Sequence, residues 1–129
     1  MNPESDNNTL RILIVDDSRH FLDAARRALE QDGITVVGVA STSAEALELA
    51  REFRPDGILV DIDLGDESGL DLAQAFASSG AAPVILISAY PASELADLIA
   101  NSPVVGFLSK SDLSANAVQS LIATERGPG

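Results

Sequence analysis

The chain has 129 residues, of which 46% are hydrophobic, and these values fit one compact domain with a single core. Eight basic and twenty acidic side chains give a formal net charge of −12, which argues against binding to nucleic acid or anionic lipid. With no cysteine and one histidine, disulfides, cysteine zinc sites and histidine clusters are excluded, so any bound metal must have oxygen ligands. Without a secretory signal or an apolar run of membrane-spanning length, we expect a cytoplasmic protein that does not enter a membrane.

Short apolar runs alternate along the chain with segments of helical periodicity. The runs predict five buried strands, at 11–15, 35–39, 57–60, 83–87 and 104–108. Apolar residues at helical spacing predict five helices, around 22–29, 46–50, 70–76, 95–99 and 113–122. Thr42 and Glu45 indicate a capping box at the start of the second helix. The alternation predicts a doubly wound α/β fold over residues 10–122, with flexible segments at 1–9 and 123–129.

Polar residues follow four of the predicted strands. Asp16 and Asp17 follow the first strand, Asp61 the third, Ser88 the fourth and Lys110 the fifth. In a parallel sheet these strand ends share one edge, where ligands bind. Three carboxylates in one crevice repel one another and favour a divalent cation with oxygen ligands, for which Mg²⁺ is suited. A phosphoryl group on Asp61 would then contact the metal on one side, and Lys110 and Ser88 on the other.

Each of these residues also has a purely structural interpretation. Asp16 and Asp17 are equally typical of a cap on the first helix, and Ser88 alone is more typical of a backbone cap. Lys110 is harder to explain in this way, because it is the only lysine in the chain and favours a specific anionic partner. His20 is interpreted as a half-exposed helix position rather than a phosphohistidine.

Four segments, taken in order, resemble the receiver domain of bacterial two-component response regulators. They are 12–18, 58–64 with Gly69, 84–89 and 106–110, and the resemblance extends over nearly the whole chain, from about residue 10 to 122. It implies a flavodoxin-like strand order, 2-1-3-4-5. It also implies a Mg²⁺-dependent transfer of a phosphoryl group from a sensor histidine kinase or phosphotransfer protein, followed by slow hydrolysis. Such a domain is a phosphoacceptor in signalling rather than an enzyme.

The resemblance assigns a role to each residue of the site. Asp61 is the phosphoacceptor, and Lys110 and Ser88 bind the phosphoryl group. Mg²⁺, for which Mn²⁺ could substitute, is bound by Asp61, directly by Asp17, through water by Asp16, and by the backbone carbonyl of Asp63. Ser88 and Phe107 are the switch residues, and Asp63 and Tyr90 tune the lifetime of the phosphoryl group.

The resemblance further implies a surface that changes on phosphorylation, formed by the fourth helix, the fifth strand and the fifth helix. An output partner or a phosphorylation-dependent homodimer would use it. We expect a stand-alone receiver without direct nucleic acid binding. The alternative is the receiver part of a larger DNA-binding regulator.

Two positions depart from the family pattern. Ser111 follows Lys110 where most members have proline, which leaves the geometry of that peptide bond open. Gly65 also replaces a usual proline and is expected to loosen the loop after the third strand.

Three other classes of protein share parts of this pattern. Asp61 and Asp63 match the D-x-D motif of haloacid-dehalogenase-like phosphatases, but that family needs further acids after its lysine, where only Asp112 and Glu125 remain. A pseudo-receiver with a vestigial site is disfavoured because every pocket residue is present. A flavodoxin-like flavin carrier is set aside, because the chain has no phosphate loop after its first strand and no tryptophan.

Overall fold

The structure is a computed structural model that describes residues 9–91, 93 and 95–126. The main strands are β1 (Arg11–Val15), β2 (Thr35–Ala40), β3 (Gly57–Asp61), β6 (Val84–Ser88) and β7 (Gly106–Ser109). The helices are α2 (Arg19–Gln31), α3 (Ser43–Phe53), α4 (Gly69–Ser79), α5 (Ala96–Ala100) and α6 (Ala115–Arg126), with a short 3₁₀ turn η2 (Lys110–Asp112) before α6. Two very short strands, β4 (Asp63–Leu64) and β5 (Glu67–Ser68), lie between β3 and α4.

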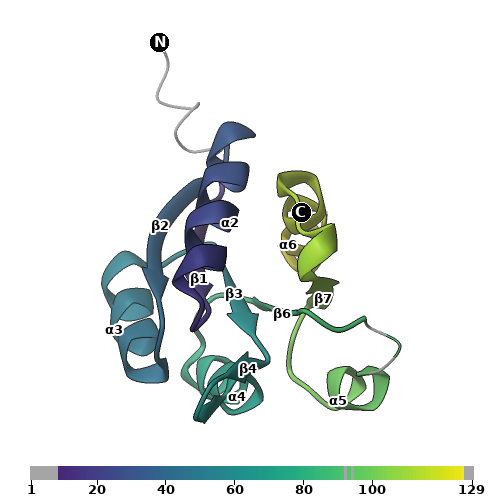
Figure 1. Cartoon of the computed structure of the whole chain (residues 1–129). Coiled ribbons are helices and arrows are strands. Elements are labelled where there is room, and N and C mark those ends of the chain that lie inside the picture. The colour runs from purple at the N-terminus through teal and green to yellow at the C-terminus, as the bar shows by residue number, and fades with distance from the viewer. Residues whose placement is uncertain (1–8, 92, 94, 127–129) are drawn as a thin grey trace.

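The five main strands form one parallel sheet in the order β2-β1-β3-β6-β7 (Figure 1). This order is 2-1-3-4-5 when only these strands are counted, so the predicted doubly wound fold and strand order are confirmed. β1, β3 and β6 form the centre of the sheet, and β3 and β6 are buried throughout. The strand order reverses between β1 and β3, where such folds place their ligands.

The core consists of two layers, one on each face of the sheet. Alternate residues of the strands point to opposite faces. One layer joins Ile12, Ile14 and Leu59 to apolar residues of α2 and α6. The other joins neighbouring strand residues such as Leu13 and Val60 to α3 and α4. Continuous burial of the central strands explains why they have unbroken apolar runs in the sequence.

Side-chain caps fix the starts of three helices at the carboxyl edge of the sheet. Ser18, Thr42 and Ser68 accept hydrogen bonds from backbone N–H groups three residues on, at the starts of α2, α3 and α4. The capping box predicted for α3 differs in one bond. The Glu45 carboxylate accepts from the N–H of Ser41, at 2.9 Å, one residue before the Thr42 cap.

The loop after β3 folds into a hairpin that the sequence analysis did not predict. β4 and β5 pair antiparallel around a two-residue turn, Gly65–Asp66. Gly65 has φ +74°, which glycine adopts easily and proline cannot. The hairpin is tied to α3, because the Glu67 carboxylate accepts a hydrogen bond from the Ser43 N–H at 2.7 Å. Gly65 thus closes a tight turn in the loop that it was expected to loosen.

The elements at the other end of the chain differ from their predicted bounds. α5 has only five residues, none of them buried. α6 continues to Arg126, four residues past the predicted end of the last helix. The predicted flexible segments include residues 1–8 and 127–129, which lie outside the described residues. None of the helices in the described part of the chain is long and apolar enough to cross a membrane.

Candidate functional site

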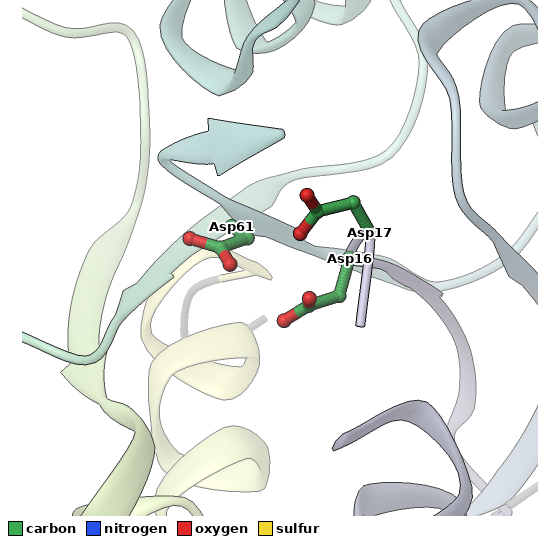
Figure 2. A group of neighbouring side chains, drawn as sticks. All are labelled: Asp16, Asp17 and Asp61. Atoms are coloured by element: carbon green, nitrogen blue, oxygen red, sulfur yellow. The ribbon is translucent and has the colours of Figure 1, made fainter. Parts of the chain in front are cut away.

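Three carboxylates meet at the carboxyl edge of the sheet, where β1 and β3 end. Asp16 and Asp17 directly follow β1, and Asp61 is the last residue of β3. One oxygen from each of the three lies within 4.8 Å of the others, and Figure 2 shows their carboxylates gathered together. Asp16 is fully buried, Asp61 is 6% exposed, and Asp17 is exposed. The topology therefore brings together the three acids that the sequence predicted as one group.

The Lys110 ammonium lies between two of these carboxylates. Its Nζ is 2.7 Å from Asp16 Oδ2 and 3.0 Å from Asp61 Oδ2. Lys110 reaches them from the start of η2, directly after β7. Its peptide bond to Ser111 is trans, since the described residues contain no cis peptide bond. The group of three carboxylates thus contains one ammonium, which contacts two of them, and the site keeps a net negative charge.

Backbone hydrogen bonds orient the two buried carboxylates. Asp16 Oδ1 accepts from the Ser18 N–H at 2.8 Å, and Asp61 Oδ1 accepts from the Asp63 N–H at 3.0 Å. In both residues this leaves Oδ2 directed at Lys110. The ammonium is the only polar partner that Asp16 Oδ2 has among the described residues. Asp16 therefore serves both as a cap of the turn before α2 and as part of the site.

Burial and charge shift the ionisation of Asp61 and Lys110. Burial raises the pKa of Asp61 from 3.8 to about 6, helped by the nearby Asp16 charge and opposed by hydrogen bonds from the Asp63 N–H and Lys110. Burial alone would lower the pKa of Lys110, but hydrogen bonds to Asp16 and Asp61 outweigh it and raise the pKa. At neutral pH the site therefore holds Asp61 as an anion at an energetic cost, which an added cation would relieve.

The acid group fits a hard divalent cation. It offers only oxygen donors, and it has fewer cationic partners than carboxylates. Asp17 is exposed, and a Cβ built on Gly65 would lie 3.0 Å from Asp17 Oδ2, so glycine keeps the space beside that oxygen free. These observations agree with the donor set that Mg²⁺ prefers.

The other predicted site residues, which are Ser88, Asp63, Phe107 and Tyr90, differ in their burial and contacts. Ser88 ends β6 and is 4% exposed, and its Oγ accepts from the Tyr90 N–H at 3.0 Å, as a backbone cap does. Asp63 is exposed, and its carboxylate accepts from the Gly65 N–H in the hairpin. Phe107 is half-buried against the core layer of α3 and α4, whereas Tyr90 is 61% exposed. Their roles as switch and tuning residues remain predictions.

Phe21 belongs to the site although the sequence analysis did not single it out. The Lys110 Nζ lies 4.3 Å from the centre of the Phe21 ring. A possible signal was its position in the first turn of α2, four residues after Asp17. His20 is exposed and is not part of the acid group.

Comparison with known proteins identifies the family. The family model for the response regulator receiver domain matches residues 12–122. A protein-glutamate methylesterase/protein-glutamine glutaminase of Myxococcus xanthus is 38% identical over 78% of this chain and 30% of its own length. The transcriptional regulatory protein PdtaR of Mycobacterium tuberculosis is 28% identical over 78% of this chain and 49% of its own length. The chain thus spans half or less of the length of these two curated relatives.

Solved structures agree with this match. A LuxR-family two-component response regulator from Aurantimonas sp. has a TM-score of 0.79 and 29% identity, covering 91% of this chain and 87% of its own. A CheY-like receiver domain from Methanospirillum hungatei has a TM-score of 0.72 and 27% identity, covering 92% and 94%. Sequence, fold and site geometry lead to one conclusion: this chain belongs to the response regulator receiver domain family.

Proposed function

We propose that this domain accepts a phosphoryl group on Asp61 in a Mg²⁺-dependent reaction, with a sensor histidine kinase or phosphotransfer protein as the donor. The observation that carries the proposal is the Lys110 ammonium between Asp16 and Asp61, within a group of three carboxylates. This arrangement combines a nucleophile, a cation to bind phosphoryl oxygens, and oxygen ligands for a metal. Membership of the receiver family supports the same reaction.

In this reaction an Asp61 carboxylate oxygen attacks phosphorus while the bond to the donor nitrogen breaks. The attacking group must be the anion, and with a pKa of about 6 Asp61 is mostly ionised at neutral pH. The Asp63 N–H holds Asp61 Oδ1, and the Lys110 ammonium is placed to bind oxygens of the transferred group. Bound Mg²⁺, held by Asp16, Asp17, Asp61 and the Asp63 carbonyl, would neutralise charge on the phosphoryl oxygens.

The phosphorylated form would then change a surface of the domain. The Ser88 Oγ accepts a hydrogen bond from the Tyr90 N–H in this structure, and we propose that this hydroxyl moves to the phosphoryl group while Phe107 turns inward. The surface affected is formed by α5, β7 and α6, where an output partner or a second copy would bind. Asp63 and Tyr90, both exposed, would tune the lifetime of the phosphoryl group.

We propose a signalling role in the cytoplasm rather than turnover of a substrate. A stand-alone receiver is our first candidate. A second candidate is the receiver part of a larger DNA-binding regulator, and the larger size is supported by the transcriptional regulatory protein PdtaR, of which this chain covers 49%. Sustained hydrolysis of a generic phosphate ester would contradict both and would favour a phosphatase.

Intact-mass measurement tests the reaction directly. The protein is incubated with acetyl phosphate, with and without Mg²⁺. We expect one added phosphoryl group in wild type with Mg²⁺, and none in Asp61→Asn or without metal. Asp66→Asn is the matched control, because it removes an exposed acid from the neighbouring hairpin turn and lies outside the acid group. Phosphorylation of Asp61→Asn while its circular dichroism matches wild type would contradict the proposal.

A further inference from the structure

The Lys110 ammonium has an uncharged neighbour besides its two carboxylates. The Phe21 ring centre lies 4.3 Å from Nζ, within the range of a cation–π interaction. The start of α2 fixes the position of Phe21, because its N–H donates to the Ser18 Oγ cap at 3.2 Å. The side chain is partly buried and packs against the core layer of α2 and α6. The ring is therefore held by elements other than the lysine that it contacts.

We propose that Phe21 is a positioning residue that keeps the Lys110 ammonium in the site once metal and phosphoryl groups occupy the carboxylates. The inference rests on the proposed function and adds a residue to it. Phe21 touches Lys110 and is not itself part of the acid group.

The reason is that the metal ion and the phosphoryl group compete with Lys110 for the carboxylate oxygens of Asp16 and Asp61. In the structure, the charged partners of Nζ are Asp16 Oδ2 and Asp61 Oδ2. A divalent cation bound by these aspartates draws on the same negative charge, and phosphorylation uses one Asp61 oxygen in a covalent bond. Both events weaken the two ion pairs seen here, and the long, flexible lysine side chain must exchange them for the phosphoryl oxygens without leaving the site. The negative face of the aromatic ring does not bind the metal, so its attraction for the ammonium remains.

Packing alone is the competing explanation, and fluorination of the ring separates the two. Fluorine atoms withdraw electron density from the ring face and weaken cation–π attraction, yet they keep the ring shape and its apolar character. We therefore compare phenylalanine with mono-, di- and trifluorophenylalanine at position 21, together with Phe21→Leu. Phe53→Leu is the matched control, because Phe53 lies at the end of α3, at the opposite edge of the sheet.

The first measurement is calorimetric binding of beryllofluoride, a phosphoryl analogue, at saturating Mg²⁺. We expect Phe21→Leu to weaken binding by about 3- to 10-fold, and each added fluorine to weaken it stepwise. Binding of Mg²⁺ without beryllofluoride should change by less than about twofold, because the carboxylates are intact. Phe53→Leu should match wild type in both measurements.

The second measurement needs no metal or phosphoryl analogue. Because Lys110 is the only lysine, lysine labelled at its ε-carbon gives one side-chain signal in a carbon–proton NMR spectrum. We expect the ε-protons to be shifted upfield by the Phe21 ring, and the shift to disappear in Phe21→Leu and persist in Phe53→Leu.

Each outcome has a distinct meaning. Unchanged beryllofluoride affinity across the fluorinated series, or a lysine signal that Phe21→Leu leaves in place, would overturn the inference and leave the proposed function standing. Failure of folded wild type to bind beryllofluoride with Mg²⁺ would overturn both.

Discussion

The amino ends and the carboxyl ends of the parallel strands, called here the amino edge and the carboxyl edge of the sheet, differ in how their charged groups are paired. At the amino edge, the Arg11 guanidinium donates to the backbone carbonyls of Phe53 and Arg54 at 2.7 and 3.0 Å, where α3 ends. The Arg11 N–H also donates to the Asp56 carboxylate at 2.9 Å. A cation at the C-terminus of a helix complements unpaired carbonyls and the helix dipole. At the carboxyl edge, three carboxylates face a single ammonium.

The difference agrees with the proposal that the carboxyl edge binds a ligand, whereas the amino edge contributes to stability. At the amino edge the Arg11 guanidinium and the Asp56 carboxylate both have partners within the chain, so their arrangement is complete without a ligand. At the carboxyl edge the acids exceed their cationic partner, and Asp61 is an anion although burial raises its pKa to about 6. An excess of buried carboxylates costs free energy that only an external cation or a proton can recover.

The largest effect is expected from Gly69→Ala, which disrupts the carboxyl edge sterically. A Cβ at Gly69 would lie 1.9 Å from the Asp61 carbonyl oxygen and 2.9 Å from the Ile62 Cα, so backbone must shift. We expect a loss of about 3 kcal/mol or more in the free energy of unfolding, measured with urea. The control is Gly38→Ala, whose Cβ would meet only side chains at ordinary contact distance, 3.5 Å and beyond. Equal midpoints for the two variants would contradict the prediction.

Bound Mg²⁺ should neutralise the excess negative charge at the carboxyl edge and so stabilise the folded state. By mass action, metal at 100 times its dissociation constant stabilises the folded state by about 2.7 kcal/mol. We expect thermal unfolding of wild type to shift upward with Mg²⁺, and that of Asp17→Asn to shift much less. Asp66→Asn should respond like wild type. A response of Asp17→Asn equal to that of wild type would remove Asp17 from the metal site.

Arg11→Ala tests the amino edge. Loss of two charge-assisted hydrogen bonds at the partly exposed end of α3 should cost about 1–2 kcal/mol, with Mg²⁺ binding unchanged. Arg26→Ala is the control, since Arg26 forms an ion pair with Glu30, at 3.5 Å on an exposed helix face, and its loss should cost less than about 0.5 kcal/mol. Similar unfolding midpoints for the two variants would show that Arg11 contributes no more than a surface ion pair.

The smallest effect is a gain in stability for Asp61→Asn without metal. A raised carboxyl pKa means that the folded state binds the proton more tightly than the unfolded state, so wild type loses stability as pH rises from 3.8 to about 6. Asn does not titrate, and it leaves Lys110 paired with Asp16. We expect the variant to be more stable than wild type by about 1 kcal/mol above pH 6 and to show no gain below pH 3.8. If Asp61→Asn were less stable than wild type at pH 7, the excess carboxylate charge at the carboxyl edge would not be destabilising, and the prediction would be wrong.

The sheet and the acid group were predictable because they depend on local patterns and on a general rule of topology. β3 and β6 are buried on both faces, so their sequences are continuous apolar runs. Asp61 ends β3, and Asp16 and Lys110 directly follow β1 and β7, so the parallel sheet places all three residues at its carboxyl edge.

The remaining features depend on contacts between distant residues or on weak local signals. The β4–β5 hairpin needs only two residues in each strand, and Glu67 bonds to Ser43 from another part of the chain. The Phe21 contact joins the first helix to the last strand's end, which no spacing rule reveals. Apolar residues at 95, 98 and 99 predicted a helix, yet the helix is short and Leu98 is 47% exposed.

The short helix α5 has a consequence for the motions of the domain. Its N-terminal end has no side-chain cap and none of its residues is buried, so little free energy opposes its local opening. We expect its amide protons to exchange with solvent much faster than those of the neighbouring strand β6. A protein that binds over α5 would therefore meet an element that can extend, shift or unwind without loss of the core.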